Sequence, residues 1–403
     1  MSIALRTPPV LDVDALLDDR DTRIVVCCGA GGVGKTTTAA ALGLRAAERG
    51  RKVVVLTIDP ARRLAQSMGI DLLDNTPRPV AGAGSDGGTL HAMMLDMKRT
   101  FDEIVEAHAD PERSRAILEN PFYQSLSAGF AGTQEYMAME KLGQLRARDD
   151  WDLIVVDTPP SRSALDFLDA PKRLGSFLDG KFIRVLMAPA KVGGRAGMKF
   201  LNVGMSLMTG TLSKLMGGQL LKDVQTFVAA MDTMFGGFRT RADATYRLLQ
   251  APGTAFLVVA APEADALREA AYFVERLAAD DMPLAGLVLN RVHGSGADQL
   301  SAERALAAAE NLEEGGIVDQ EAGKADLRDP AAPEGSADAL AAGLLRLHAE
   351  RMQVIARERS TRDRFSSLHP EVPVAEVAAL PGDVHDLAGL RAIGDRLTTG
   401  QSI

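Results

Sequence analysis

The sequence has little of what builds disulfide frameworks or metal clusters. Among 403 residues there are only two cysteines, Cys27 and Cys28, and they are adjacent. They lie in a short apolar run that we expect to be a strand, where neighbouring side chains point to opposite faces. The two thiols therefore neither pair usefully nor share one metal ion. A disulfide-stabilised fold and a zinc site made of CxxC pairs are excluded.

An excess of positive charge and a long apolar run are also absent. With 45 Lys and Arg against 54 Asp and Glu, the formal net charge is −9, which offers no general basic surface to a nucleic acid backbone. No apolar run approaches the roughly 18–20 residues that span a bilayer. Residues 1–22 carry acids where a signal peptide needs a basic and then an apolar stretch. We expect a cytoplasmic protein with no integral membrane segment, for which nucleic acid is not the main partner.

Short apolar runs alternate with helical patterns along the chain. A helical pattern from Thr37 to Glu48 separates the first two runs. Continuous apolar strands separated by helices predict an α/β fold, with a doubly wound, mostly parallel sheet covered on both faces. The expected strands are residues 23–28, 53–58, 90–95, 152–157, 254–260, 284–289 and, more weakly, 371–377.

Two long stretches without strands, about 98–148 and 161–248, interrupt this alternation and predict an inserted helical subdomain. The organisation expected from the sequence is an extension (1–22), core (23–97), first helical part (98–148), core strand (149–165), second helical part (166–250) and C-terminal core (251–403). Residues 310–337 are rich in Glu, Asp, Gly, Pro and Ala, and we expect them to form an acidic loop.

One motif has a specific chemistry. Gly29-Ala30-Gly31-Gly32-Val33-Gly34-Lys35-Thr36 fits the pattern G-x-x-x-x-G-K-[ST], directly after a predicted strand and before a predicted helix. Such a loop turns backbone N–H groups toward phosphate oxygens at the positive end of a helix. The pattern predicts that Lys35 contacts the β- and γ-phosphates of ATP and that Thr36 binds Mg²⁺, with Thr37 next to the nucleotide.

Two carboxylates follow predicted strands at the edge where such a sheet binds its ligand. Asp157 is a candidate Mg²⁺ ligand, either directly or through water, and Asp59 is a candidate for orienting the attacking water. Each is also placed where an Asp caps a helix, so a purely structural role is the alternative.

The chain from Gly29 to Gly69, GAGGVGKTTTAAALGLRAAERGRKVVVLTIDPARRLAQSMG, resembles the opening of the ArsA family of deviant-Walker-A ATPases. These are P-loop NTPases related to MinD-type ATPases and to the eukaryotic ATPase that targets tail-anchored membrane proteins. DTPPSRSALDFL (157–168) resembles the family's switch II segment. Pro262-Glu263 and VLNRV with Asn290 resemble its adenine-contacting region. The resemblance runs from about 23 to 293, with a weaker echo at Leu380-Pro381-Gly382, and it is closest to an actinobacterial pair of ArsA-like subunits.

The resemblance implies roles for individual residues. It assigns Asp59 to the nucleophilic water, Asp157 to the metal and Asn290 to the adenine ring. Family members act as dimers that close around nucleotide, so the resemblance also implies a nucleotide-driven dimeric switch.

This chain departs from the family pattern at Ala30, where the family has a lysine that reaches the partner's phosphates. Cations acting across an interface are worth on the order of 10³–10⁵ in rate. We therefore expect a heterodimer with a paralogous subunit that retains the lysine. The alternative is that another cation substitutes, with Arg62, Arg63 and Arg162 as candidates.

Other departures limit what can be inferred. Ser163 replaces the switch II histidine, the zinc cysteines of the eukaryotic dimer are absent, and two neighbouring cysteines do not support binding of trivalent arsenic. A Met- and Gly-rich region at 181–238 is either a groove for a hydrophobic helix client or interior packing. A regulatory subunit with little hydrolysis and a membrane-cycling ATPase remain alternatives. For the apolar stripe of Leu387, Leu390, Ile393 and Leu397, we favour packing over membrane binding.

Overall fold

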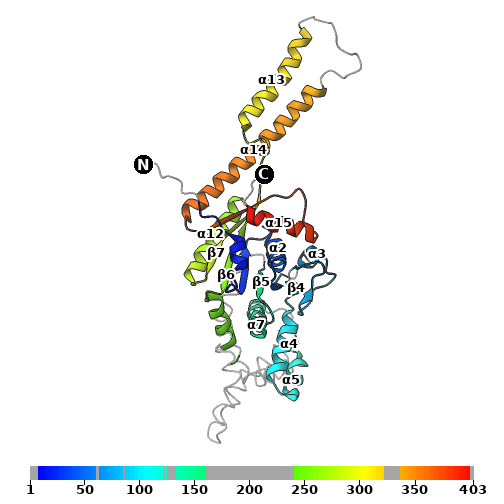
Figure 1. Cartoon of the computed structure of the whole chain (residues 1–403), viewed down its shortest axis with the longest axis vertical. Helices are drawn as coiled ribbons and strands as arrows, with labels where there is room; N and C mark the ends of the chain where they lie inside the picture. Colours follow the sequence, from blue (N-terminus) through cyan, green and yellow to red (C-terminus); the bar gives the residue numbers. More distant parts are fainter. Residues whose placement is uncertain are drawn as a thin grey trace, which may run out of the picture.

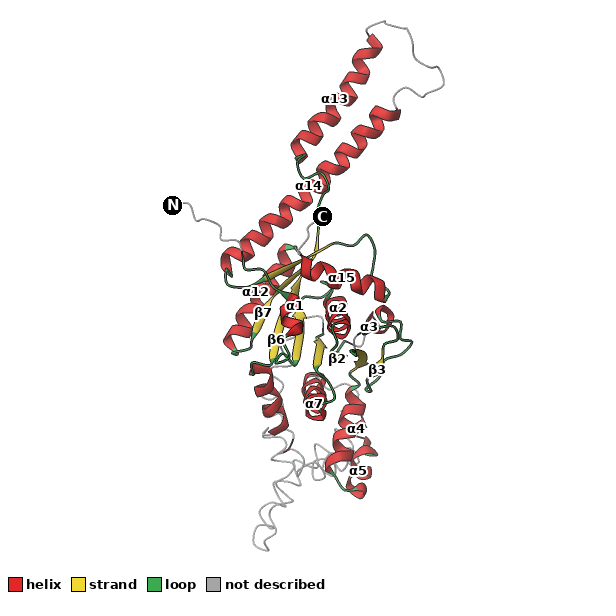
Figure 2. Cartoon of the chain, in the orientation of Figure 1, coloured by secondary structure: helices red, strands yellow, loops and turns green. Residues whose placement is uncertain are grey.

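The computed structural model of the chain is an α/β fold around one eight-stranded sheet, shown in Figures 1 and 2. It describes residues 8–59, 63–85, 87–121, 123–124, 133–159, 237, 240–321 and 336–399. The strands are β1 (Ile24–Gly29), β2 (Lys52–Thr57), β3 (Arg78–Pro79), β4 (Thr89–Met94), β5 (Leu153–Asp157), β6 (Thr254–Ala260), β7 (Leu284–Val292) and β8 (Val374–Ala378).

The sheet has the strand order β3-β4-β2-β5-β1-β6-β7-β8. All neighbouring pairs are parallel except β3 with β4. The predicted fold class is thus confirmed. Because β1 is central, its carboxyl end lies between those of β5 and β6, which is where a doubly wound sheet binds its ligand.

Helices cover both faces of the sheet. One face packs against α1 (Val13–Asp18), α2 (Lys35–Glu48) and α15 (Leu387–Thr399), and the other against α4 (Met97–His108), α7 (Thr133–Arg148) and α12 (Ala264–Ala279). Cys27 packs in the first layer and Cys28 in the second, so their predicted opposite orientation is confirmed. Strands buried on both sides explain why their sequences are continuously apolar.

Both ends of the described chain belong to this core. In α1, Val13 and Leu17 are fully buried, and a parallel bridge joins Val10 to Val374. The residues expected to form an N-terminal extension are therefore packed against the core from residue 10 onward. In α15, Leu390, Ile393 and Leu397 are buried, so the preference for packing of this stripe is confirmed.

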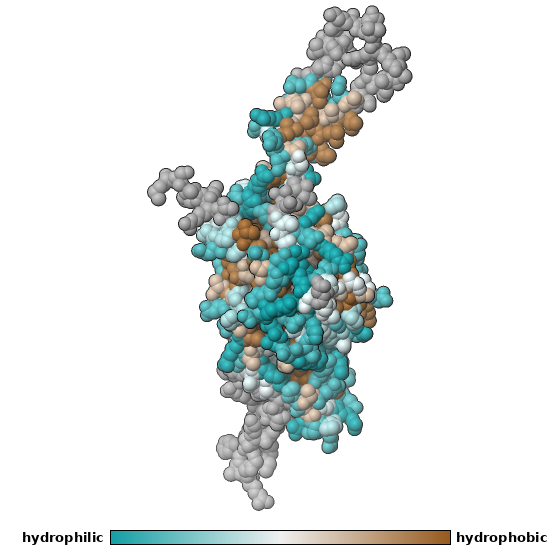
Figure 3. All heavy atoms as spheres, in the orientation of Figure 1, coloured by the Kyte–Doolittle hydropathy of each residue, from teal (hydrophilic) through white to brown (hydrophobic). Residues whose placement is uncertain are grey.

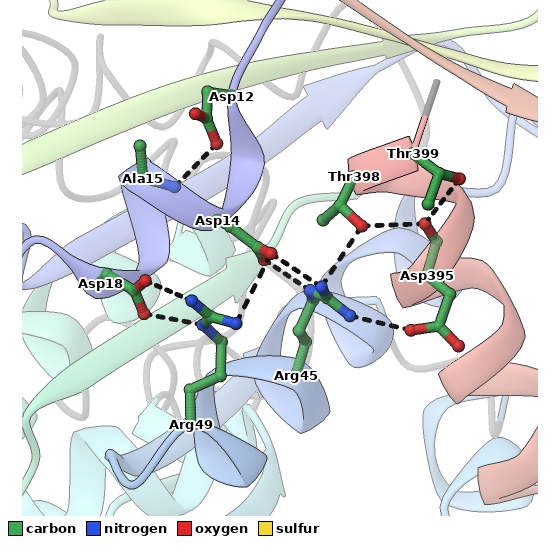
Figure 4. A network of polar contacts seen from close by, with 9 residues as sticks. All are labelled: Asp12, Asp14, Ala15, Asp18, Arg45, Arg49, Asp395, Thr398 and Thr399. Carbon is green, nitrogen blue, oxygen red and sulfur yellow. Dashed lines mark hydrogen bonds and ion pairs between the residues drawn. The ribbon is translucent and has the colours of Figure 1, made fainter. Parts of the chain in front are cut away.

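An arginine of α2 joins these terminal helices (Figure 4). Arg45 donates two hydrogen bonds to Asp14 of α1, from Nε at 2.6 Å and from Nη2 at 2.8 Å. Its Nη1 also donates to Asp395 of α15 at 3.0 Å. Arg49, one turn later, pairs with Asp18. The ion pairs fix three helices of one layer relative to each other.

The described residues of the two long stretches without strands are largely helical. Besides α4 and α7, residues 98–148 contain α5 (Pro111–Leu118), and α3 (Arg63–Ser67) follows β2. Residues 240–250 are helical, but the Met- and Gly-rich region at 181–238 lies outside the described residues apart from Gly237.

The prediction of an acidic loop at 310–337 is wrong for residues 310–321 and 336–337, which are helical. Residues Ala302–Glu321 form α13, and Ser336–Leu368 form the 33-residue α14, so two helices pack as a hairpin that projects from the core (Figure 1). The charged composition indicated a loop, but Ala and Glu are also strong helix formers. None of the described helices is long and apolar enough to cross a bilayer.

Apolar side chains remain at the surface of this hairpin. Leu340, Leu344 and Leu347 are spaced along α14 and are 65%, 58% and 63% exposed. A brown patch lies on the hairpin in Figure 3 and stands out from the mostly hydrophilic surface of the core.

Candidate active site

The phosphate loop of residues 29–36 joins β1 to α2, as the sequence predicts. Gly34 is the N-cap of α2, with a left-handed φ of 93°, and no side chain caps the helix. The N–H groups of the first turn therefore carry the positive end of the helix dipole without a competing side-chain acceptor. This arrangement suits an anion.

The backbone of the adjacent strand β6 leaves room only for glycine at the first position of the loop. Gly29 has a φ of 146°, and a Cβ at this position would lie 2.1 Å from the carbonyl oxygen of Val259 on β6. Any side chain would push β1 and β6 apart at the point where the loop leaves the sheet. Glycine at position 29 therefore lets the loop begin while β1 is still paired with β6.

Lys35 is held against the loop that it follows. Its side chain is buried, and Nζ donates to the carbonyl oxygens of Gly29 at 2.9 Å and Ala30 at 2.6 Å. Burial lowers the pKa of Lys35, while the nearby carboxylate of Asp157 opposes this shift. With three N–H donors, the ammonium group still has one for a further acceptor.

Asp157 lies below the loop at the end of β5 and is fully buried. Its Oδ2 accepts a hydrogen bond of 2.9 Å from the hydroxyl of Thr57 at the end of β2. Burial raises the pKa of Asp157 to about 6, although the nearby hydroxyls of Thr36 and Thr57 oppose this shift. Within the described part of the chain, its Oδ1 is buried without a hydrogen-bond partner. A buried carboxylate oxygen close to a threonine hydroxyl fits Mg²⁺, which prefers such oxygen ligands.

A cavity of about 450 Å³ opens beside the loop. Of the residues predicted from the sequence, Gly32, Gly34, Lys35, Thr36, Thr37 and Asp59 line it. The cavity thus brings together the phosphate loop and the carboxylate that follows β2. Asp59 reaches this position because β2 ends at Thr57, whose hydroxyl accepts a hydrogen bond of 3.2 Å from the Asp59 N–H.

Part of the cavity wall was not predicted. Gln66 and Ser67 come from α3, Thr158 follows β5, Arg291 lies near the end of β7, and Asp383, Val384 and His385 follow β8. Arg291 lies near the end of its strand and residues 383–385 follow theirs, at the same edge of the sheet as the phosphate loop. This position at the carboxyl ends of strands is the sequence signal that could have predicted them. Arg63, one of the candidate substitute cations, also lines the cavity.

Other predicted residues lie behind this wall or outside the described chain. The amide of Asn290 donates from Nδ2 to the carbonyl oxygen of Val33 at 2.8 Å, so its observed contact is with the phosphate loop. Gly31 is exposed, whereas Ala30 is only 7% exposed. Arg62, Arg162 and Ser163 lie outside the described residues.

Comparison with known proteins agrees with this geometry. The family model of the anion-transporting ATPases matches residues 22–314. ATPase GET3 of Malassezia globosa is 30% identical over 167 residues, which cover 41% of this chain and 47% of that protein. ATPase GET3 of Podospora anserina is 24% identical over 300 residues, covering 73% of this chain and 81% of its own.

A third relative, ATPase ARSA2 of Chlamydomonas reinhardtii, is 24% identical over 279 residues, which are 69% of this chain and 70% of that protein. The match to the family model includes the phosphate loop, both carboxylates, Asn290 and most of the sheet. From this match and the fold, we conclude that the chain belongs to the ArsA-type family of anion-transporting ATPases.

Proposed function

We propose that this chain binds Mg²⁺-ATP and hydrolyses it to ADP and phosphate. The observation that carries the proposal is the placement of Lys35, Thr36 and Asp59 around one cavity, with Asp157 buried next to Thr36 and Thr57. An uncapped helix N-terminus, a lysine and two carboxylates are the groups that phosphoryl transfer to water requires.

Each residue has a distinct role in this proposal. Lys35 turns its remaining N–H toward the β- and γ-phosphates, and the loop N–H groups of residues 29–36 bind the phosphate oxygens. Thr36 and Asp157 hold Mg²⁺, which would neutralise phosphate charge when bound. Asp59 accepts a hydrogen bond from the attacking water and orients it. Thr37 and Asn290 complete the nucleotide site.

We further propose that the active form is a nucleotide-driven dimer, and that its partner is a paralogous ArsA-like subunit. The support is Ala30, whose methyl group supplies no charge where the family places a lysine that acts across the interface. A homodimer of this chain would lack that cation in both sites. In a heterodimer, the partner's lysine completes the site of this chain.

One observation favours a second candidate. Arg63 lines the same cavity as Asp59, so its guanidinium is available within the same chain to stabilise charge on the phosphates. If Arg63 substitutes for the lysine, the chain hydrolyses ATP alone. A regulatory subunit that binds nucleotide but turns it over slowly is the remaining alternative.

We propose that the switch controls the binding of a client protein through a hydrophobic helix of that client. The client would be bound in the cytoplasm, by the Met- and Gly-rich part of residues 166–250. The support comes from composition, because methionine side chains adapt to varied apolar partners. Cycling on a membrane through α15 has less support, since the apolar side chains of α15 are buried against the core.

The decisive experiment compares steady-state ATP hydrolysis by the purified chain alone and with the paralogue that copurifies from its native cells. We expect slow turnover alone and stimulation by the partner on the order of 10³-fold. Ala30→Lys should raise the rate of the chain alone. Fast turnover by the wild-type chain alone would refute the partner requirement, and no ATP binding in either sample would refute the function.

A further inference from the structure

Asn290 connects two parts of the sheet that are far apart in sequence. It lies near the end of β7, whereas Val33 belongs to the phosphate loop after β1, and β6 lies between these strands. The Nδ2 atom of Asn290 donates to the Val33 carbonyl oxygen at 2.8 Å, and Oδ1 accepts from the Arg291 N–H at 3.0 Å. Both side chains are buried, with Asn290 at 7% and Val33 at 3% exposure. The amide is therefore a fixed bridge between β7 and the loop.

Gly34 fits this amide closely. A Cβ at Gly34 would lie 2.3 Å from Nδ2 of Asn290, and its φ of +93° is one that side chains rarely adopt. The space next to Gly34 is thus occupied by the amide that holds the preceding carbonyl. The Asn290 amide thus packs against Gly34 and donates its hydrogen bond to the preceding carbonyl oxygen, that of Val33.

The peptide bond between Val33 and Gly34 is the part of the loop that this bridge controls. Rotation of a peptide plane changes ψ of the first residue and φ of the second, and glycine permits almost any φ. If this plane turned over, the Val33 carbonyl oxygen would exchange places with the Gly34 N–H. A carbonyl oxygen facing the cavity would repel phosphate, whereas an N–H attracts it.

Asn290 is absent from the lining of the cavity, while its neighbour Arg291 forms part of that lining. Arg291 has a left-handed φ of 63°, which turns the chain at this point. The direct wall on this side is therefore Arg291, and Asn290 supports the loop from behind.

We propose that Asn290 is a positioning residue that locks the Val33–Gly34 peptide with its N–H toward the phosphates. This inference rests on the proposed nucleotide binding and deepens it. It assigns Asn290 an effect on triphosphate binding that does not depend on the base. An adenine contact alone would affect only ligands that carry a base.

The test uses Mg²⁺ with ATP and with inorganic tripolyphosphate, which has the phosphates without a base, and measures dissociation constants by calorimetry. Asn290→Ala should weaken both ligands by a similar factor, roughly tenfold, because one buried hydrogen bond and the loop conformation that it holds are lost. Unchanged tripolyphosphate affinity with weakened ATP affinity would overturn the proposal.

A matched control separates this effect from a general loss of stability. Asn75 is also a buried amide, at 5% exposure, and its Oδ1 accepts from the Thr100 hydroxyl at 3.0 Å, away from the cavity. Asn75→Ala should leave both affinities unchanged. If the loss of any buried amide weakened binding through a general loss of stability, Asn75→Ala would weaken both ligands as well. Equal weakening by the control would contradict a specific role of Asn290.

A second variant keeps the test informative if Asn290→Ala does not fold. Asn290→Leu keeps a similar side-chain volume without a donor, and it should also weaken both ligands. If the wild-type chain binds neither ligand, the proposed function fails. If it binds both and the Asn290 variants keep normal tripolyphosphate affinity, only the present inference fails.

Discussion

The hydroxyl of Thr57 donates a hydrogen bond of 2.9 Å to Oδ2 of Asp157, between the ends of the neighbouring strands β2 and β5. The same hydroxyl accepts the N–H of Asp59 at 3.2 Å. One buried threonine therefore binds the carboxylate of Asp157 and the backbone N–H of Asp59, the two residues whose carboxylates the proposed hydrolysis uses. A hydroxyl can do this because it is donor and acceptor at once.

Replacing this threonine should affect hydrolysis more than binding. Thr57→Val keeps the shape of the side chain but removes its hydroxyl, so Asp59 and Asp157 lose their common anchor. We expect kcat for ATP to fall about 10- to 100-fold with a small change in affinity, because orientation of the water is lost. Rates measured with the activating partner would check this.

Thr254→Val is the matched control for Thr57→Val. Thr254 is also buried, and its hydroxyl donates to the Leu248 carbonyl oxygen at 2.8 Å, at the amino end of β6 and away from the cavity. This control should keep its kcat. A Thr57→Val enzyme with unchanged kcat would show that the shared hydroxyl has no catalytic importance.

Asp157→Asn should stabilise the nucleotide-free protein against unfolding and reduce the effect of Mg²⁺ on its affinity for ATP. Burial raises the pKa of Asp157 to about 6, above the value of an exposed aspartate, so its ionised form at pH 7.5 destabilises the folded chain. Removing the charge should raise the free energy of unfolding on the order of 1–3 kcal/mol. Thermal melts without nucleotide, and ATP titrations with and without Mg²⁺, measure the two effects.

The opposite pattern would contradict this assignment. If Asp157→Asn melts at a lower temperature and keeps the full effect of Mg²⁺ on ATP affinity, the carboxylate serves the fold and not the metal.

The sequence predicted the part of the site that is local in the chain. The phosphate loop follows from eight consecutive residues, and the strand on each side of α2 follows from uninterrupted apolar runs. Asp59 and Asp157 are site candidates on the same basis, because both follow such runs. Each of these features depends on neighbours only a few residues away, which is why the pattern alone was sufficient.

The rest depends on contacts that the sequence does not display. Asn290 and Val33 are 257 positions apart, so their hydrogen bond arises only when the sheet has formed. β3 has two residues, too few to show a strand pattern. α13 extends through residues 310–321, where the charged residues indicate a loop although the alanines favour a helix.

Arg63 distinguishes the two explanations for Ala30. If a partner subunit supplies the missing cation, Arg63→Ala should lower the partner-stimulated rate less than threefold, since another cation then carries the transition-state charge. If Arg63 is the substitute, the same change should lower the rate of the chain alone by on the order of 10³-fold. Arg99→Ala on α4, outside the cavity lining, is the control and should change neither rate.

The ion pair between Arg45 and Asp14 should contribute stability that depends on pH. The Arg45 hydrogen bonds lower the pKa of Asp14 below its ordinary value, so the contribution is present above about pH 4 and is lost as pH falls through the folded-state pKa. Arg45→Met should cost about 1 kcal/mol at pH 7, since both side chains are partly exposed.

Urea unfolding of the Arg45→Met variant at several pH values checks this. The difference from wild type should shrink toward pH 3. A difference that stays constant between pH 7 and pH 3 would contradict an electrostatic origin and indicate lost packing of the arginine side chain.

The most direct test of the whole account is calorimetric titration of the intact chain with Mg²⁺-ATP, beside the variant Lys35→Met. Methionine keeps the length of the side chain but removes its charge and donors, so the contact to the phosphates is lost. We expect one nucleotide per wild-type chain and at least a roughly 30-fold weaker affinity for the variant, which corresponds to about 2 kcal/mol for a charged hydrogen bond. No ATP binding by the wild-type chain, or equal binding by both proteins, would contradict it.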